Sequence, residues 1–440
     1  MIDTNIYKTK KAAYYTLGCK LNFAETSQLG KQLSAAGYRK VHAGEEADVC
    51  IVNTCSVTDT ADHKCRQAIK RLKRQHPNAI MVVTGCYAQL NPEEIAAIDG
   101  VNLVLGAGEK FDVVNFIEQW NAENSVEIHK TPIQKVKEFH PSCSGTDRTR
   151  YFLKVQDGCD YYCTYCTIPF ARGRSRNASI RETVELATKA VAEGAKEIVL
   201  SGVNIGDFGK STGENFFDLV RALDTLPEEV RFRISSIEPD LLTDELIEFI
   251  ALSHHFMPHF HIPLQAGSNE ALLLMKRRYS TELFAHKVEV IKKWLPDAFI
   301  GVDVIVGTRG ETEELFEKSK NFIASLDISQ LHVFTYSERE GTKMILMEQN
   351  VPLAERKRRS DELHLLSEQK TQLFYESQMG KEAEVLWEGR HNGSKMVGFT
   401  ANYIRVERPY EKKKVNTIEK IKLGGWNDQH SALIALGYHD

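Results

Sequence analysis

Apolar runs rich in β-branched residues alternate with helical periodicity through residues 12–120. One helix is predicted to start near Glu25, a second to run through Arg74 and a third to end at Trp120. Strands are predicted in the runs AAYYTLG, ADVCIVNT, AIMVVTG and VNLVLG. This alternation is typical of a small doubly wound α/β domain with a parallel sheet, which we assign to residues 1–122.

The pattern changes after this first domain. Residues 123–149 lose the periodicity and contain two prolines, so we predict a linker there. Residues 150–375 contain six strand candidates, and a helical segment follows each of them except the last. The candidates are FLKVQDG, EIVLSGV, RFRISSI, PHFHIPL, FIGVDVIVG and QLHVFTYS. Six such repeats predict a partial (β/α)6 barrel that is open on one side.

The last part of the chain, residues 376–440, carries short strand patterns separated by Gly, Asn and Pro. This spacing predicts a small all-β, OB-like barrel. Trp387, Phe399 and Tyr403 lie here, in a stretch with more basic than acidic residues. Aromatic and basic side chains on such a barrel are typical of a surface that stacks bases and binds phosphates.

Composition limits the function classes. The 440 residues have a formal net charge of −4, which argues against general nucleic-acid binding and requires local basic patches for any RNA contact. The start, MIDTNIYKTKK, lacks the apolar run of a signal peptide, and no stretch approaches the ~18 apolar residues of a membrane span. We therefore expect a cytoplasmic protein, and a monomer. Its nine cysteines are then metal ligands or reduced thiols.

Cys159, Cys163 and Cys166 give the strongest local signal, because they share one short loop beyond the first predicted barrel strand. Active sites of β/α barrels lie at this end of the strands. Three thiolates can hold three corners of a [4Fe–4S] cluster, and the open iron would bind S-adenosylmethionine and cleave it to a radical. A structural zinc loop is the alternative, but zinc sites usually show a second Cys or His pair, and none follows here.

A second set, Cys19, Cys55 and Cys86, is dispersed along the chain, but each member directly follows a predicted strand. Such positions converge at the carboxyl edge of a parallel sheet, where ligands bind in doubly wound folds. We therefore predict a second metal cluster with an open site; three unrelated buried thiols are the alternative. The predicted packing or exposed thiols are Cys50, Cys65 and Cys143.

These motifs resemble the methylthiotransferases of the radical S-adenosylmethionine superfamily over nearly the whole chain. The matching segments are GCKLNFAE, NTCSVTDTADHKCRQ, GCYAQ, GCDYYCTYCTIPFARGRSR and HIPLQAGSNEALLLMKRRY. The resemblance implies that the Cys19 set binds an auxiliary [4Fe–4S] cluster on which sulfur and methyl are assembled, and that the C-terminal barrel is an RNA-binding TRAM domain. Lys20-Leu21-Asn22 and Ser56-Val57-Thr58 look most like the branch that acts on N6-threonylcarbamoyladenosine at tRNA nucleotide 37.

The chain departs from the family pattern at two strand ends. Thr308 and Arg309 stand where Phe and Pro are usual, and Thr335 stands where Pro is common. These departures could alter how the substrate base is held, and they leave the cysteine motifs intact.

Further candidates are assigned by position. Residues at barrel strand ends or in the radical loop are candidates for binding S-adenosylmethionine, although turn chemistry alone could also explain them; they are Tyr165, Ser201, Gly202, Asn204, Ser235, Glu238, Gln265 and Ser268. Basic residues on one helix face and in the C-terminal barrel are candidates for binding RNA, with a plain solvated surface as the alternative; they are Arg66, Lys70, Lys73, Arg74, Arg405 and Lys413. Arg172, Arg174 and Arg176 are predicted to face a substrate or cofactor carboxylate.

The expected function is methylthio transfer to tRNA, with two [4Fe–4S] clusters and S-adenosylmethionine as cofactors. One S-adenosylmethionine would methylate a sulfur at the Cys19 set, and a second would supply the radical that takes hydrogen from C2 of the adenine. A flavodoxin or ferredoxin is the expected electron donor, and the sequence identifies no sulfur source. The alternatives are action on N6-isopentenyladenosine in tRNA or on a ribosomal protein, or a non-catalytic RNA-binding iron–sulfur sensor.

Overall fold

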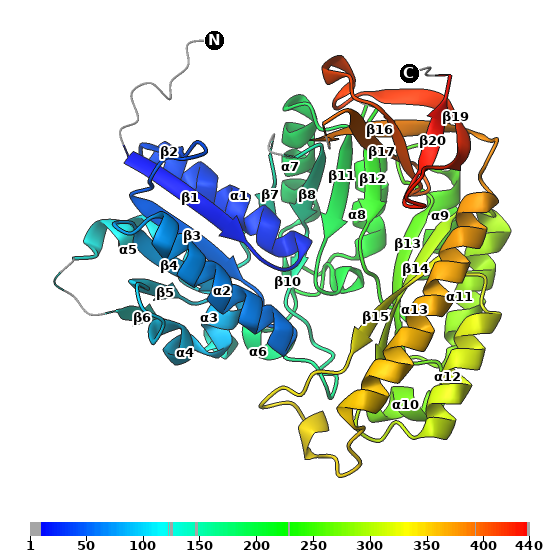
Figure 1. Cartoon of the computed structure of the whole chain (residues 1–440), viewed down its shortest axis with the longest axis horizontal. Helices are drawn as coiled ribbons and strands as arrows, with labels where there is room; N and C mark the ends of the chain where they lie inside the picture. Colours follow the sequence, from blue (N-terminus) through cyan, green and yellow to red (C-terminus); the bar gives the residue numbers. More distant parts are fainter. Residues whose placement is uncertain are drawn as a thin grey trace.

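A computed structural model describes residues 10–121, 123, 126–145, 148–227, 229–391 and 393–437 (Figure 1). Within these ranges no helix is long and apolar enough to cross a membrane. The chain forms an N-terminal α/β domain, a central half-open barrel and a small C-terminal barrel, so the predicted fold class is confirmed.

The N-terminal domain is built on a six-stranded parallel sheet with the order β2-β1-β3-β4-β5-β6. Its strands are β1 (Lys10–Thr16), β2 (Tyr38–Lys40), β3 (Val49–Thr54), β4 (Ile80–Gly85), β5 (Leu103–Leu105) and β6 (Glu127–His129). Its helices are α1 (Lys20–Ala35), α2 (Asp59–Gln75), α3 (Cys86–Leu90), α4 (Pro92–Ala96) and α5 (Val113–Gln119). Alternate residues of β3 pack on opposite helical layers, Ile51 with α1 and α5 and Val52 with α2 to α4. The sheet is therefore covered on both faces, as a doubly wound fold requires.

The segment predicted as a linker contains short strands. Within it, β6 pairs with β5, and β7 (Ser142–Cys143) pairs antiparallel with the first barrel strand. Elements of two or three residues are too short to produce an alternating pattern, so the sequence does not reveal them. Cys143 is accordingly a buried thiol. The helix predicted near Glu25 begins at Lys20, directly after Cys19.

The central barrel contains the six predicted parallel strands in two sheets. They are β8 (Arg150–Lys154), β11 (Glu197–Ser201), β12 (Arg231–Ile234), β13 (His259–Gln265), β14 (Phe299–Val306) and β15 (Gln330–Thr335). Single bridges join β12 to β13. The larger outer helices are α7 (Ile180–Ala192), α8 (Phe216–Asp224), α9 (Asp244–Leu252), α11 (Thr281–Trp294), α12 (Glu313–Ser325) and α13 (Leu353–Glu376). Smaller elements are β9 (Gln156–Asp157), β10 (Arg176–Asn177), α6 (Ile168–Arg172) and α10 (Asn269–Leu274). Among the described residues no strand pairs with the outer edge of β15, which leaves the barrel open there.

Helix α1 of the N-terminal domain packs on the inner face of the open barrel. Tyr151 and Leu153 of β8 belong to the main hydrophobic cluster, which also contains residues of the outer helices. Phe152 lies between them in the strand and therefore points the opposite way, toward the inside of the barrel. Phe152 packs with Ala24 and Phe23 of α1 in a separate cluster. The N-terminal end of α1 therefore lies at the barrel interior, beside β8 (Figure 1).

The C-terminal domain is a closed five-stranded barrel that packs against the end of the central barrel where strands β8 and β12 begin. Its strands are β16 (Glu382–His391), β17 (Lys395–Thr400), β18 (Arg405–Pro409), β19 (Ile418–Trp426) and β20 (Leu433–Leu436). Arg150 Nη1 donates a hydrogen bond of 3.2 Å to Tyr403 Oη, and the guanidinium of Arg233 lies 4.9 Å from the Tyr403 ring centre. Trp387 is fully buried in the small barrel. The prediction that these two aromatic residues form an RNA surface is therefore wrong, because they serve a domain interface and a core.

Gly85 provides a test of this architecture. It has a φ of +101°, and a Cβ atom there would lie 2.3 Å from Thr54 O on the neighbouring strand. Gly85→Ala should lower the free energy of unfolding by at least about 3 kcal/mol, because strain and a backbone clash add. Gly44 is the matched control: its φ is +85° and nothing lies within 4 Å, so Gly44→Ala should cost only about 1–2 kcal/mol. Urea unfolding measures both, and equal losses would contradict the close contact.

Candidate active site

The first cysteine set lies on the loop between β9 and α6. Gly158, with a φ of +74°, turns the chain so closely against the Arg174 carbonyl that any Cβ would lie 2.1 Å from it. Cys159 Sγ accepts a hydrogen bond of 3.4 Å from Tyr161 N. Arg277 Nη1 lies 3.0 Å from Cys163 Sγ and places a positive charge beside that thiol. The loop therefore holds three sulfur atoms beyond the carboxyl end of the first barrel strand, with a cation next to one of them.

The second cysteine set is gathered by three neighbouring strands. Cys19 is the N-cap of α1 after β1, Cys55 directly follows β3, and Cys86 is the first residue of α3 after β4. A Cβ at Gly18 would lie 2.6 Å from Cys55 Cβ, so the chain ending β1 touches the second cysteine. The prediction that these strand ends converge is thus met by the geometry.

Two asparagines join the strand ends at this second set. Asn22 Nδ2 donates to Leu17 O at 2.7 Å and to Thr54 O at 3.0 Å. Asn53 Nδ2 donates to Asn22 O at 3.0 Å. The first turn of α1 is therefore hydrogen-bonded to the carboxyl ends of both β1 and β3, which holds Cys19 next to Cys55.

Burial raises the pKa of Cys55 and Cys86 in one set and of Cys159, Cys163 and Cys166 in the other. The pKa of Cys55 rises to about 12, first because of burial and then because Cys86 and Cys19 are close. The pKa values of Cys159 and Cys166 also rise to about 12, with burial as the main cause. Iron binds thiolates, so cluster binding would release these protons and would satisfy sulfur atoms that are otherwise neutral in an enclosed site.

A buried ionic network, centred on Glu25 and Asp157, joins the two domains beside these cysteines. Glu25 of α1 contacts Lys110 at 2.7 Å, Lys154 at 2.8 Å and Arg172 at 3.1 Å. Asp157 contacts Lys154 and Arg172 at 2.7 and 2.9 Å, and also Arg176 at 3.2 Å. Burial alone would raise the pKa of Glu25, but the three cations hold it below its ordinary value. Four cations thus surround two carboxylates, and the excess charge lies near the thiols.

Arg172 extends this network to the second cysteine set. Its Nη2 donates a hydrogen bond of 2.5 Å to Asn22 Oδ1, and its charge interacts with Cys86 and Cys19. Arg174 is largely exposed and pairs with Asp160. The prediction that the arginines at 172, 174 and 176 face a substrate or cofactor carboxylate is wrong, because each of the three is paired with a carboxylate of the protein itself.

A second link between the domains lies on the other side of the site. Arg339, from the loop after β15, donates from Nη2 to Ser56 Oγ at 2.6 Å and pairs with Asp59 and Asp62 at 2.7 Å each. Helix α3 after Cys86 also packs against α6 after Cys166. The segment after Cys55 and the helix that begins at Cys86 are therefore both held in contact with the barrel.

One pocket of about 220 Å³ is lined by Cys166 of the first set and by residues that closely follow Cys55 of the second set. Val57 and Thr58, just after Cys55, form one wall. The radical loop forms another wall with Tyr165, Cys166 and Thr167, and barrel strand ends complete it with Gln265, Asp303, Ile305, Phe334 and Thr335. This pocket is where a group could meet chemistry from both cysteine sets.

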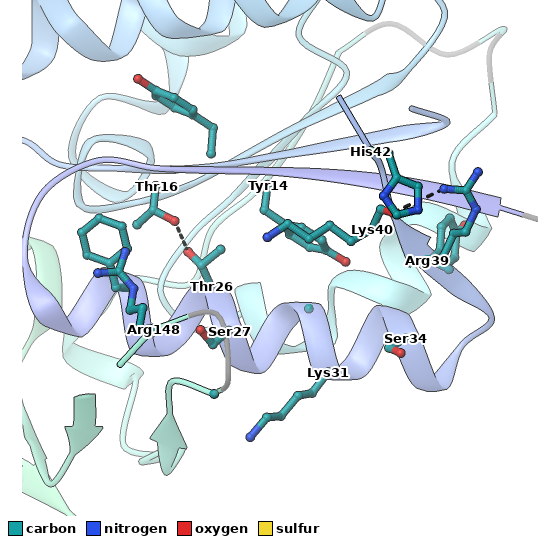
Figure 2. Close-up of a pocket in the computed structure, with 15 residues that line it drawn as sticks. Tyr14, Thr16, Thr26, Ser27, Lys31, Ser34, Arg39, Lys40, His42 and Arg148 are labelled. Atoms are coloured by element: carbon teal, nitrogen blue, oxygen red, sulfur yellow. Dashed lines mark hydrogen bonds between the residues drawn. The ribbon is translucent and has the colours of Figure 1, made fainter. Parts of the chain in front are cut away.

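A larger groove of about 640 Å³ lies elsewhere, between α1 and the strands β1 and β2 (Figure 2). Lys31, Arg39, Lys40 and Arg148 line it, and it contains no cysteine among the residues described. Size therefore does not identify the active site, whereas the chemistry of the lining residues does.

Three residues predicted to bind S-adenosylmethionine present buried polar atoms without a partner in the described structure. They are Asn204, with both side-chain polar atoms, Ser235 Oγ and Gln265 Oε1. Gln265 also has a φ of +65°, which is unusual for a residue other than glycine. Buried polar atoms are normally hydrogen-bonded, so these residues fit a polar ligand that the bare chain lacks.

The remaining cofactor candidates have visible protein partners. Ser268 Oγ accepts from Ala271 N as the N-cap of α10, and Ser201 Oγ donates to Val199 O. Gly202 packs against the Gln156 side chain, and the Tyr165 hydroxyl accepts from Arg277. Glu238 pairs with Arg277, although burial raises its pKa to about 7. Their roles in cofactor binding stay predictions.

The predicted RNA-binding residues lie away from the pocket. Arg66 pairs with Glu94 at 2.7 Å, and Lys73 Nζ donates to Pro77 O. Lys70 and Arg74 are exposed on α2. In the C-terminal barrel, Arg405 is half-buried and Lys413 is exposed beside Glu411. An RNA role for all six stays a prediction.

The two departures from the family pattern differ in position. Thr335 lines the pocket, whereas Thr308 is buried. Arg309 pairs with Glu338 at 2.9 Å and donates to Met347 O at 2.7 Å. Only Thr335 is thus placed to touch a bound substrate.

Iron content tests the donor set. Each set of three thiols fits one [4Fe–4S] cluster, so the reconstituted protein should contain about eight iron atoms per chain. Replacing Cys19, Cys55 and Cys86 by Ser should leave about four, and so should replacing Cys159, Cys163 and Cys166. Cys143→Ser is the control and should retain all of the iron. About four iron atoms in the unaltered protein would refute the second cluster.

Comparisons with known proteins agree with this site. Residues 11–106 match the family described as uncharacterized protein family UPF0004, and residues 153–323 match the radical SAM superfamily. The threonylcarbamoyladenosine tRNA methylthiotransferase MtaB of Bacillus subtilis is 39% identical over 93% of each chain. The tRNA-2-methylthio-N(6)-dimethylallyladenosine synthase of Desulfitobacterium hafniense is 30% identical over 94% of each chain.

Among solved structures, the radical S-adenosylmethionine methyltransferase TsrM from Kitasatospora setae shares the fold. Its TM-score is 0.57 at 15% identity, and the match covers 76% of this chain and 75% of TsrM. The chain therefore belongs to the radical S-adenosylmethionine methylthiotransferase family, whose cofactors are [4Fe–4S] clusters and S-adenosylmethionine.

Proposed function

We propose that the protein converts N6-threonylcarbamoyladenosine at nucleotide 37 of tRNA to its 2-methylthio derivative. The observation that carries this proposal is the single pocket bounded by Cys166 on one side and by the residues after Cys55 on the other. Replacing a C–H bond of an adenine by C–S needs both a radical source and a sulfur donor at one carbon atom. A pocket lined by Cys166 and by the residues just after Cys55 lies between the two cysteine sets, as this requirement demands.

The chain's own residues hold and orient the reacting groups. When bound, the clusters would supply the electron that cleaves S-adenosylmethionine and the site at which the methylthio group is held. Asn204, Ser235 and Gln265 would hold S-adenosylmethionine with their unpartnered polar atoms. Arg277 places a fixed positive charge beside Cys163, which favours the thiolate that the cluster needs.

The apolar walls of the pocket protect the radical step. Val57, Ile305 and Phe334 line it, so the bound base would displace water from the reacting carbon. Thr335 replaces the more common proline at this wall and adds a hydroxyl group that could contact the base.

The tRNA would present the base from the open edge of the barrel at β15, with exposed cations such as Lys70, Arg74 and Lys413 as candidate phosphate contacts. A small electron-transfer protein such as a flavodoxin or ferredoxin would supply the electrons.

The choice of substrate rests on two comparisons. The MtaB relative from Aquifex aeolicus is 36% identical over 90% of this chain and 96% of its own length. The synthase that acts on dimethylallyladenosine matches at lower identity, 30%. Action on isopentenyladenosine is thus the second candidate, and product analysis separates the two.

Nucleoside mass spectrometry of tRNA tests the substrate. The gene is expressed in a bacterial strain that makes N6-threonylcarbamoyladenosine but lacks its 2-methylthio derivative. We expect that derivative to appear, and we expect none with Cys159→Ala, because the radical cluster then loses a ligand. Methylthio-isopentenyladenosine as the sole new product would contradict the substrate assignment. No new product, combined with no 5′-deoxyadenosine release under reducing conditions, would favour a non-catalytic sensor.

A further inference from the structure

Next to the reaction pocket, the barrel interior contains a group of side chains that the cysteine chemistry does not use. We call Lys20, His261, Asp303 and His332 the interior cluster. His261 Nε2 and Asp303 Oδ1 are 2.7 Å apart, and one nitrogen of His332 lies within 4.8 Å of both. These three residues come from the neighbouring strands β13, β14 and β15 and share one face. Asp303 itself lines the reaction pocket, so the cluster continues from it.

Lys20, from the N-terminal domain, lies near enough for its charge to act on His332 of this cluster. It is the first residue of α1, whose next turn packs on the inner face of β8 through Phe23 and Ala24. Its charge interacts with Tyr403, Arg150 and Arg233 at the interface with the C-terminal barrel, and with His332. It directly follows Cys19, so its backbone is fixed beside the second cysteine set.

Lys20 is half-buried and, unlike the neighbouring arginines, has no carboxylate partner among the described residues. Arg233 pairs with Glu197 at 3.0 Å, and Arg150 pairs with Glu388 at 2.8 Å. Within the described part of the chain, the Lys20 ammonium forms no hydrogen bond or ion pair, and its cationic neighbours repel it. When a bound base displaces the remaining water from this half-buried ammonium group, its charge becomes costly unless an anion joins it.

The charge of the surroundings decides which ligand fits. His261, Asp303 and His332 could by themselves hold a metal cation, but the charge of Lys20 acts on His332 and opposes a further positive charge there. A carboxylate has the right sign, and it could accept hydrogen bonds from Lys20 Nζ and from a ring nitrogen of His332.

We propose that Lys20, assisted by His332, binds the carboxylate of the threonylcarbamoyl substituent and thereby selects this base. The inference rests on the proposed function, since it assigns a recognition site for that substrate. The threonyl group carries a carboxylate and a hydroxyl, whereas an isopentenyl group is an uncharged hydrocarbon. Binding the hydrocarbon would leave the Lys20 ammonium desolvated and unpaired, and a site built for a polar group rejects such an analogue strongly.

Equilibrium binding to the cluster-loaded protein tests the proposal. The probes are two anticodon stem-loop RNAs that differ in one group: one carries N6-threonylcarbamoyladenosine, and the other carries its methyl ester, which lacks the negative charge. The unaltered protein should bind the acid roughly 10- to 100-fold more tightly than the ester, as expected for a charged hydrogen bond. Lys20→Met should bind both RNAs with the affinity of the ester, and Lys20→Arg should regain part of the preference.

The matched control is Lys31→Met, which removes the same charge from an exposed position on the same helix. It should keep the preference for the acid. Iron content and the visible absorption spectrum are measured for every variant, because Lys20 adjoins Cys19. If Lys20→Met loads iron poorly, His332→Asn decides instead, since His332 belongs to a barrel strand remote from the cysteines in sequence; it should reduce the preference several-fold.

The possible outcomes distinguish a failure of the proposed role of Lys20 from a failure of the proposed function. A Lys20→Met protein that still prefers the acid overturns the proposal, and so does an unaltered protein that binds acid and ester equally. Either result leaves methylthio transfer to threonylcarbamoyladenosine intact if that product is formed. A protein that binds and modifies only isopentenyladenosine RNA would instead overturn the proposed function.

Discussion

The geometry of the site depends on the buried ionic network around Glu25 and Asp157. Glu25 belongs to the N-terminal domain, whereas Lys154, Asp157 and Arg172 belong to the barrel, so the network crosses the domain boundary. A buried ion pair is rarely a large source of net stability, yet removing one partner typically costs about 3–5 kcal/mol because the other charge is left unpaired. Sliding α1 by one helical turn would unpair several charges at once. The network therefore fixes the position of α1 on the barrel more than it adds to stability.

This fixed position has a chemical consequence. The same Arg172 that pairs with Glu25 also interacts with Cys86 and Cys19, so one side chain connects the domain interface to the second cysteine set. Six thiolates would bring negative charge into an enclosed region, and the excess of cations over carboxylates in the network compensates part of it. Arg277 has the corresponding place beside Cys163 in the first set. Each set of thiols thus has one buried guanidinium group, Arg172 or Arg277, whose positive charge interacts with its sulfur atoms.

Much of this organisation could be predicted from the sequence, because repeated strand patterns and cysteine positions are local signals. Cys19, Cys55 and Cys86 could be grouped because parallel strands place their carboxyl ends along one edge. Partners chosen by tertiary packing could not be predicted. Arg339 lies far along the chain from Ser56, and no periodicity connects them. Gly18 and Gly158 bring chains into contact, but a sequence does not show which neighbour a glycine admits.

The errors have the same physical origin. Trp387 and Tyr403 are aromatic residues in a basic stretch, and the sequence does not distinguish a stacking surface from a core or a domain interface. The sequence predicts a ligand for Arg172 and Arg176, because it does not show that their carboxylate partners lie in other elements. Lys20 was considered only as part of a motif, and its lack of a carboxylate becomes apparent when the barrel interior is assembled around it.

The central claim is that the two cysteine sets hold clusters that face one pocket. Electron paramagnetic resonance of the fully reduced protein tests this most directly, because two nearby paramagnetic clusters couple magnetically. We predict that the spectrum of the intact protein differs from the sum of the spectra of the two variants that each retain one cluster, with broadened or split signals. A spectrum equal to that sum would show that the clusters do not share a site and would contradict the account.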